Sequence, residues 1–301
     1  MPIQWAGDQM STWEELRHVL TAGLSIGLSG VPLWGFDIGG FAGPLPEKEL
    51  YERAVQMAAF VPVMQWHSEP VGGQFAELFP GSNGNNDRSP WNISEFYDDR
   101  ELLTKLRFWF RLRMNLLPYL YHQSLLSGES GLPMMRHLAV EYPADVKALD
   151  IDDCFMLGDL LVAPILEKGK CERTVYLPEG VWECLWPLGV YDEDGKLRKE
   201  MHCLKGGQTY MVECGMDRIP VFLRSGGCIA LNLGEDYSLG SDVGNRVYGY
   251  SNLCFYPAGK EGEYEFRDDL GNEILIQWKE GHVASKQISG MVSFEVLDKL
   301  V

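Results

Sequence analysis

The stretch IQWAGDQMSTWEELRHVLTAGLSIG, residues 3–27, decides the fold of this chain. Its short apolar start reads as a strand, and the strand ends at a Gly-Asp turn. The residues that follow read as a helix, with Ser11 as the expected N-cap, Glu14 as its capping-box partner and Gly27 near its end. The stretch therefore predicts one strand–helix unit.

This unit recurs along the first third of the chain. A second strand-like run, VPLWG, precedes a helical stretch from about residue 47 to 60, and a third run, VPVMQW, follows it. The polar residue after each run is Asp8, then Asp37, then His67, at spacings of 29 and 30 residues. A (β/α)₈ barrel uses about 31 residues per unit and places its active site at the carboxyl ends of its strands. We expect these three side chains to surround one barrel mouth.

A long loop and a long helix follow the third run. Residues 68–95 are rich in Gly, Asn, Ser and Pro, and a loop of this length in a compact domain is usually functional or disordered. Arg88 lies in it and could reach the barrel mouth, although a surface arginine is the simpler interpretation. Residues 99–126 predict an amphipathic helix with a kink or break before Pro118, which would close the last barrel unit.

From about Asp152 the pattern changes to period-two strands with tight turns, which is typical of a β-sandwich. The sequence thus predicts an α/β part followed by an all-β part: about three βα units from the C-terminal portion of a TIM barrel, then β-sandwich domains. The expected domains are residues 1–148 for the barrel part, 149–232 for a proximal β-sandwich and 233–301 for a distal β-rich domain. Because three units leave open sheet edges, we expect the first 140 or so residues to fold poorly in isolation.

Composition narrows the classes of partner. The 43 acidic and 26 basic residues give a net charge of −17, which repels nucleic-acid phosphates and anionic lipid heads. No apolar run is long enough to cross a bilayer, and the N-terminal residues lack the pattern of a signal peptide. We therefore expect neither a nucleic-acid nor a membrane partner.

The seven cysteines form an odd set without a CxxC pair, which predicts free thiols in a reducing cytoplasm. The six histidines do not cluster with the cysteines, so no metal or other cofactor is implied.

Each candidate site residue also has a structural interpretation. Asp8 could be a turn or capping aspartate, Asp37 could form an Asx turn helped by Gly39 and Gly40, and His67 could be a structural histidine. Against this, Ser11 suits the capping role better and leaves the Asp8 carboxylate free, beside the indole of Trp5. An apolar wall raises a carboxyl pKa, as a general acid requires. The spacing alone indicates a barrel enzyme with two carboxylates and a histidine.

Several linked motifs resemble glycoside hydrolase family 31. WAGDQMSTWEEL, GLSGVPLWGFDIGGFAG, ELYERAVQMAAFVPVMQWH and LLPYLY followed by GLPMMRHLAVEYPAD are similar, in order and spacing, to the acid/base half of that family's catalytic barrel. GDLLVAPILEKGKCERTVYLPEGVWECLW with IPVFLRSGGCIAL resembles the β-sandwich that follows the barrel. The resemblance covers roughly residues 1–232 and is weaker beyond.

The resemblance implies a retaining, exo-acting α-glycosidase of α-glucosidase or α-xylosidase type that acts on small saccharides or oligosaccharides. It makes Asp8 the general acid/base and Trp5 the aromatic residue beside it. It makes Asp37 and His67 hydrogen-bonding partners of sugar hydroxyls, and Phe41 part of the pocket wall. The family's frequent Arg-Asn-His is here Gln65-Trp66-His67, which keeps only the histidine.

The nucleophile expected from the resemblance, an aspartate in a Trp-x-Asp-Met-Asn-Glu motif, does not occur in the 301 residues. The chain could be a fragment of a longer protein, or another polypeptide or a second copy could complete it. Two hypotheses follow, a glycosidase and a catalytically silent carbohydrate-binding or assembly module. An unrelated aldolase or metal hydrolase would need a Schiff-base lysine or clustered metal ligands, and the three strand ends offer neither.

Overall fold

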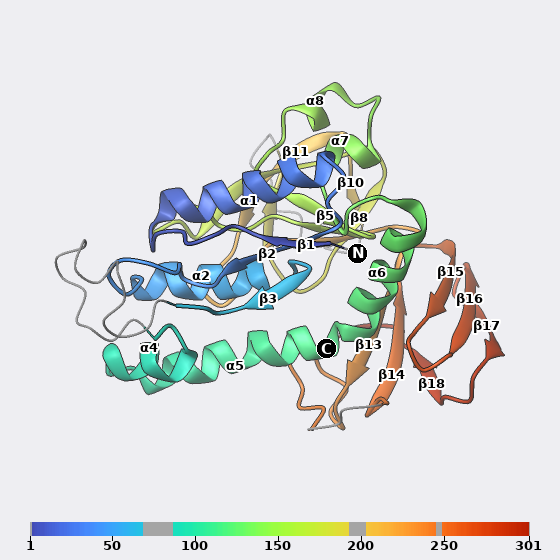
Figure 1. Ribbon diagram of the computed structural model, residues 1–301. Helices are drawn as coiled ribbons and strands as arrows, with labels where there is room; N and C mark the ends of the chain where they lie inside the picture. The colour runs from blue at the N-terminus through green and yellow to red at the C-terminus, as the bar shows by residue number, and fades with distance from the viewer. Residues whose placement is uncertain (1, 69–86, 193–202, 245–248, 301) are drawn as a thin grey trace.

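A computed structural model describes residues 2–68, 87–192, 203–244 and 249–300 (Figure 1). The helices of this part are α1 (Trp13–Leu28), α2 (Lys48–Ala58), α4 (Pro90–Phe96), α5 (Arg100–Asn115), α6 (Leu117–Ser130), α7 (Leu138–Glu141) and α8 (Val146–Leu149). The strands are β1 (Ile3–Trp5), β2 (Leu33–Asp37), β3 (Val63–Gln65), β4 (Met135–Arg136), β5 (Phe155–Leu157), β6 (Leu160–Val162), β7 (Glu172–Leu177), β8 (Val181–Cys184), β9 (Gly189–Tyr191), β10 (Leu204–Lys205), β11 (Gln208–Glu213), β12 (Val221–Arg224), β13 (Cys228–Leu233), β14 (Asn252–Pro257), β15 (Glu261–Arg267), β16 (Glu273–Lys279), β17 (His282–Ser289) and β18 (Phe294–Val296).

The first three strands form a parallel sheet in the order β1-β2-β3. Trp5 pairs with Gly35 in one ladder, and Asp37 pairs with Gln65 in the other. Helix α1 connects β1 to β2, and α2 connects β2 to β3. The predicted series of three strand–helix units is therefore confirmed, and the carboxyl ends of all three strands lie at one edge of the sheet.

The start of α1 differs from the prediction by one residue. Thr12, not Ser11, is the N-cap, and its side chain accepts a hydrogen bond from the Glu15 backbone N–H. Ser11 instead accepts a hydrogen bond from the Arg88 guanidinium at 3.0 Å. Both residues have a hydroxyl suited to capping, so sequence preference alone could not separate them.

The segment expected to be one long loop is partly helical. Residues 69–86 lie outside the described residues, but α4 occupies 90–96. Ser89 caps this helix by accepting from Asn92, and Pro90 takes the first helical position, where its missing N–H costs nothing. The Ser-Pro pair was thus a helix start within a composition typical of loops.

The long amphipathic helix breaks as predicted. Helix α5 ends at Asn115 and α6 begins at Leu117, with Pro118 in the first turn of the second helix. Proline fits there because the first N–H groups of a helix have no partner within it. The two helices turn the chain from the parallel sheet toward the β-rich part (Figure 1).

The chain beyond the helices is built mainly of antiparallel strand pairs, as the period-two pattern predicts, although β14 and β18 pair parallel. A six-stranded sheet, β10-β8-β12-β6-β5-β4, and a three-stranded sheet, β7-β11-β9, make up the proximal part. Two further three-stranded sheets, β13-β14-β18 and β15-β16-β17, make up the distal part. Strand β13 contains residue 232, the predicted boundary, and pairs with β14. The domain boundaries at 148 and 232 remain predictions.

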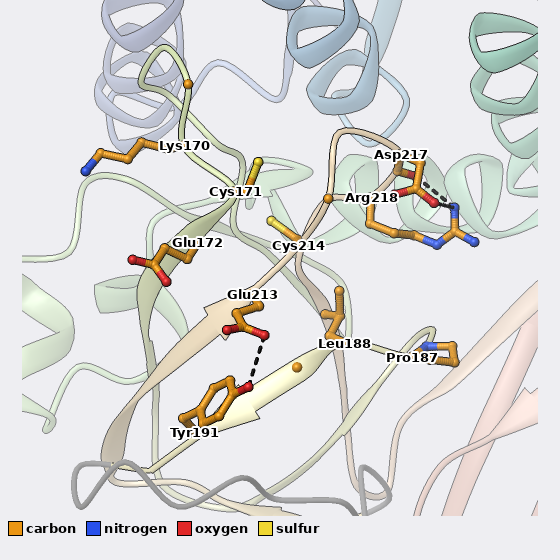
Figure 2. Close-up of a pocket in the computed structure, with 13 residues that line it drawn as sticks. Lys170, Cys171, Glu172, Pro187, Leu188, Tyr191, Glu213, Cys214, Asp217 and Arg218 are labelled. Carbon is orange, nitrogen blue, oxygen red and sulfur yellow. Dashed lines mark hydrogen bonds and ion pairs between the residues drawn. The ribbon is translucent and has the colours of Figure 1, made fainter.

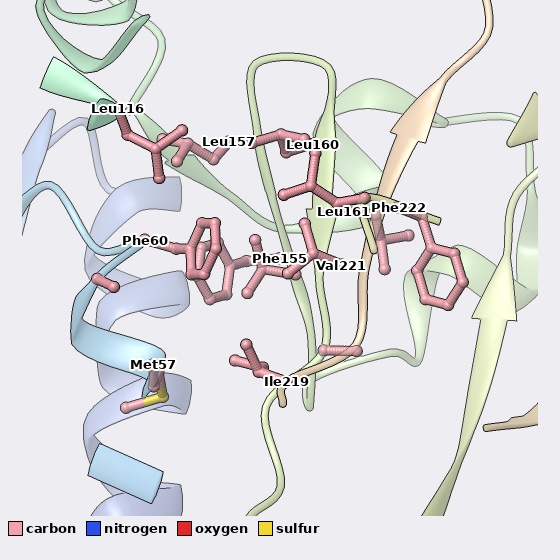
Figure 3. Close-up of a cluster of buried hydrophobic side chains, with 14 of the residues drawn as sticks. Met57, Phe60, Leu116, Phe155, Leu157, Leu160, Leu161, Ile219, Val221 and Phe222 are labelled. Atoms are coloured by element: carbon pink, nitrogen blue, oxygen red, sulfur yellow. The ribbon is translucent and has the colours of Figure 1, made fainter. Parts of the chain in front are cut away.

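One apolar cluster joins the helices to the β-rich part. Figure 3 shows Phe60, which follows α2, and Leu116, between α5 and α6, directed toward Phe155 and Leu157 of β5. All four side chains are fully buried. Burying a large apolar side chain stabilises by about 1.5–3 kcal/mol, so this cluster fixes α2, α5 and the β-rich part together. Within the described ranges, none of the helices has the length and apolar character needed to span a membrane.

Candidate active site

The alternation of side chains along β2 places Asp37. Trp34 points to the helical side, where its indole N–H donates to the Val19 carbonyl of α1 at 3.1 Å. Gly35 and Asp37 therefore face the opposite side of the sheet. A Cβ on Gly35 would lie 2.8 Å from the Val63 side chain, so glycine lets β2 and β3 approach closely here.

The Asp37 carboxylate is buried, and only one of its two oxygens has a hydrogen-bond partner among the described residues. Its exposed fraction is 0%, and Oδ1 accepts a hydrogen bond from Gln65 Nε2 at 2.9 Å. Oδ2 is buried without a hydrogen-bond partner among the described residues. Burial raises the pKa of Asp37, and the charge of Asp8 adds to this effect, whereas the Gln65 hydrogen bond and the charges of His67 and Arg88 oppose it.

The Asx-turn interpretation of Asp37 is wrong. The turn after β2 is closed by the backbone, because Gly40 N–H donates to the Asp37 carbonyl at 2.9 Å. Gly39 and Gly40 have φ of +78° and +91°, values that only glycine adopts freely, as the sequence predicted for this turn. The carboxylate therefore takes no part in the turn, and its Oδ2 remains without a hydrogen-bond partner among the described residues.

Gln9 ties the loops after β1 and β2 together. Its side-chain amide donates to the Asp37 carbonyl at 2.8 Å. The backbone carbonyl of Gln9 accepts hydrogen bonds from the backbone N–H groups of Phe41 at 2.8 Å and Ala42 at 3.2 Å. These bonds hold Asp8, the preceding residue, against the turn that carries Phe41.

Asp8 lies just beyond the carboxyl end of β1. Gly7, with φ +80°, turns the chain between Trp5 and Asp8. Since Thr12 caps α1, the Asp8 carboxylate is not used there. The side chains of Asp8 and Trp5 are both exposed, Trp5 by 51%. Because β1 and β2 pair parallel, Asp8 and Asp37 lie at the same end of the sheet, and the charge of Asp8 raises the pKa of Asp37.

The rings of His67 and Phe41 contact each other beside Asp37. Their ring centroids are 5.0 Å apart with the planes tilted by 52°. His67 is exposed, and Phe41 is buried. The charge of His67 lowers the pKa of Asp37.

Arg88 is not a surface arginine. It is fully buried, and its guanidinium donates to Ser11 Oγ and to the carbonyls of Ala42 and Gly43 at 3.0–3.1 Å. Its own carbonyl accepts a hydrogen bond from Tyr51 at 2.5 Å. Arg88 thus fixes the loop that carries Phe41, and its charge acts on Asp37 from behind that loop.

The structure therefore brings Asp8, Asp37 and His67 to one end of the sheet, with Phe41 and Arg88 supporting them. Charged acceptors, an imidazole and an apolar ring in one place suit a ligand with several hydroxyl groups. No three His, Cys, Asp or Glu side chains of the described part come together as metal ligands.

The sequence does not predict the residues that hold the site in place. Nothing in the sequence marks Gln9 for this role except its position next to Asp8, and the sequence predicts Ser11 as the cap of the helix. Gln65 enters the resemblance only as a departure from Arg-Asn-His, although its place at the end of a predicted strand, two residues before His67, is readable from the sequence.

Comparison with known proteins identifies the family to which this chain belongs. Residues 1–123 match the glycosyl hydrolases family 31 TIM-barrel domain, and residues 131–229 match the family 31 C-terminal domain. The chain belongs to glycoside hydrolase family 31.

Individual relatives agree with this assignment. The chain is 38% identical over 275 residues to an isomaltosyltransferase of Sporosarcina globispora, covering 90% of this chain and 23% of that protein. It is 31% identical to an alpha-xylosidase of Saccharolobus solfataricus, covering 93% of this chain and 33% of that one. It also resembles the cycloalternan-forming enzyme of Listeria monocytogenes in complex with a pentasaccharide substrate, with a TM-score of 0.78, 39% identity, and coverage of 91% of this chain and 24% of that one. The chain thus spans about a quarter to a third of the length of these relatives.

Proposed function

We propose that this chain is the acid/base half of a retaining, exo-acting α-glycosidase of α-glucosidase or α-xylosidase type. The observation that carries the proposal is the buried Asp37 carboxylate, whose Oδ2 has no hydrogen-bond partner in the described part. The charges of His67 and Asp8 act on the pKa of this carboxyl group. A buried, unpaired carboxylate oxygen is costly unless a ligand completes it. A sugar hydroxyl is a donor of the right kind.

Each candidate residue has a role in this proposal. Asp8 protonates the leaving glycosidic oxygen and then, as a base, activates water. Asp37 and His67 bind sugar hydroxyls. Phe41 and Trp5 form apolar walls, and Arg88 holds the loop of Phe41 in place and adds positive charge beside Asp37.

Double displacement also needs a nucleophilic carboxylate about 5–5.5 Å from the acid. The motif that carries it in this family is not among the 301 residues. We propose that it comes from the rest of the barrel, supplied by a longer form of this protein or by another polypeptide. That part would pair with the edges of β1 and β3, which have no further neighbouring strand among the described residues. A homo-oligomer would not supply it, because each copy has the same sequence.

A second candidate function follows from the same observation. Without a nucleophile, the chain would bind saccharides or assemble with a partner and would not hydrolyse them. The two functions predict the same ligand class and differ only in turnover.

Calorimetry of the purified chain with glucose, xylose, maltose and isomaltose, beside an activity assay, separates these two functions. Binding without turnover favours the silent module for the isolated chain. Turnover that appears when the missing barrel part is added favours the glycosidase. An absence of binding in both preparations contradicts both.

The role of Asp8 is tested in the protein with a complete barrel. Asp8→Asn should lower hydrolysis of a poorly activated glycoside by about 10²–10⁴-fold, and affect an activated aryl glycoside much less, because a good leaving group needs no proton. Glu14→Gln, an exposed change of the same kind on α1, is the matched control. Equal losses on the two substrates would refute the acid/base assignment.

For the cellular setting we propose the cytoplasm, since the seven cysteines are free thiols. The partner proposed is a small saccharide or oligosaccharide. The net charge of −17 argues against nucleic acid and membrane surfaces.

A further inference from the structure

Two cysteines far apart in the sequence lie opposite each other at the end of a strand ladder. Strands β7 and β11 pair antiparallel up to Glu172 and Glu213. The next pair in this register is Cys171 and Cys214, and Cys214 N–H donates to the Cys171 carbonyl at 2.7 Å. Opposite residues of an antiparallel ladder direct their side chains to the same face, and Figure 2 shows both thiols at this end of the two strands.

The ladder sets the separation of these two residues. Hydrogen-bonded pairs in antiparallel ladders have Cα atoms about 5.5 Å apart, and disulfides form when this distance is about 4.4–6.8 Å. The other cysteines that lie in ladders have different residues opposite them. Cys184 pairs with Phe222, Cys228 with Pro257 and Cys254 with Leu231.

A buried arginine from the barrel part fixes the backbone on both sides of the pair. Arg53 of α2 is 1% exposed. Its guanidinium donates to the carbonyl of Lys170 at 3.1 Å and to that of Gly215 at 3.2 Å, the neighbours of Cys171 and Cys214. Because both flanking peptide groups are held by one planar cation, the two Cβ atoms keep the spacing that the ladder gives them.

The two thiols differ in access. Cys171 is exposed and lines an open cavity of about 1190 Å³, together with Lys170 and Arg218 (Figure 2). Cys214 is buried. Burial raises the pKa of Cys214 to about 11, and the nearby Cys171 adds to this effect, so Cys214 is mainly a protonated thiol at neutral pH.

We propose that Cys171 and Cys214 are a redox modification site, a dithiol that a small-molecule disulfide such as oxidised glutathione converts to a cross-strand disulfide. The Cys171 thiolate attacks one sulfur of the oxidant and releases one glutathione thiolate, which takes up a proton. Cys214 loses its proton and attacks Cys171 in this mixed disulfide, releasing the second glutathione. The two protein thiols are oxidised, and one glutathione disulfide is reduced to two thiols.

The bond would link the ends of β7 and β11, beside the carbonyls that Arg53 of α2 binds. It would close the loop from Cys171 to Cys214, and closing a loop of this size removes conformational freedom from the unfolded chain. The oxidised form should therefore melt at a higher temperature than the reduced form.

The test treats the reduced 301-residue chain with oxidised glutathione and follows it by intact mass and by peptide mapping without reductant. The expected product has lost two hydrogen atoms, links the peptides of Cys171 and Cys214, and melts several degrees higher. Reduction with dithiothreitol should restore the original mass and melting temperature.

Variants separate the pair from general thiol reactivity. Cys203→Ser is the matched control, because Cys203 is also exposed, and it should leave the link intact. Cys214→Ser should stop the reaction at a glutathione adduct on Cys171, and Cys171→Ser should accumulate little adduct on the buried Cys214. A wild-type product with glutathione retained on Cys171, or a link that includes Cys203, would overturn the proposal.

Discussion

Gln65 Nε2 donates to Asp37 Oδ1 at 2.9 Å, across the last pair of the β2–β3 ladder. A neutral amide is thus the only hydrogen-bonding side chain on this carboxylate in the part of the chain that the structure describes. An amide orients a carboxylate but does not cancel its charge. Burial therefore dominates, and the pKa of Asp37 is raised.

Asp37→Asn should stabilise the chain at neutral pH. Because the folded-state pKa of Asp37 is raised above 3.8, the folded state binds this proton more tightly than the unfolded state does. Wild-type stability therefore falls as pH rises from about the unfolded pKa through the folded one, and it levels off above that. Asn keeps the oxygen that accepts from Gln65 and carries no charge.

Thermal melts of both proteins between pH 4 and pH 8 check this prediction. The advantage of the variant should be small at pH 4, grow with pH and then become constant, while saccharide binding is lost. An advantage that is independent of pH would show that desolvation of the carboxylate is not the cause.

Gly40→Ala should lower the free energy of unfolding by more than the strain of an alanine in the left-handed conformation. Gly40 has φ +91°, and a Cβ there would lie 2.7–2.8 Å from atoms of Ser11, which binds Arg88. The strain costs about 1–2 kcal/mol, and the clash should add about 1–3 kcal/mol.

Gly30 offers a matched control for this substitution. Its φ is +89°, and a Cβ there meets open space. Gly30→Ala should show the strain alone. Urea denaturation of the two variants measures the difference, and equal losses would mean that Ser11 and its loop move aside.

The strand–helix repeat was predictable from the period of the apolar residues and from the length of each unit. The shared position of Asp8, Asp37 and His67 then followed from one rule, that residues after parallel strands meet at one edge of the sheet. The cap at Thr12, the helix at Pro90 and the burial of Arg88 were not predictable. They depend on backbone carbonyls and close contacts that form only when distant segments pack.

Arg53→Met should destabilise the chain strongly. Arg53 donates to the carbonyls of Lys170, Gly215 and Arg218 and to the side chain of Gln56. Methionine fills similar volume but leaves these buried acceptors unpaired, at a cost on the order of 3 kcal/mol.

Arg111→Met is the control for this change. Arg111 forms an ion pair with Asp242, and their side chains are 40% and 62% exposed. Exposed pairs contribute little to stability, so the free energy of unfolding measured in urea should hardly change in this variant. A similar loss in both variants would mean that charge, not burial, sets the effect of Arg53.

The edge strands of the parallel sheet should be the least stable part of the isolated chain. β1 and β3 each pair with one strand only, β2, among the described residues. Ile3 and Trp5 of β1 are 58% and 51% exposed. In contrast, α2 and α5 share the apolar cluster that contains β5 (Figure 3). The poor folding expected for the first 140 residues should therefore be confined to the sheet and should spare these helices.

Hydrogen exchange measures this gradient directly, because exchange rates report local opening. Amides of β1 and β3 should exchange much faster than those of α5, β5 and β12. Adding the missing barrel part should protect β1 and β3, since a closed barrel has no edges. Equal, strong protection of all these elements in the isolated chain would mean that the three strands are stable without neighbours, and would remove the physical reason for a completing partner.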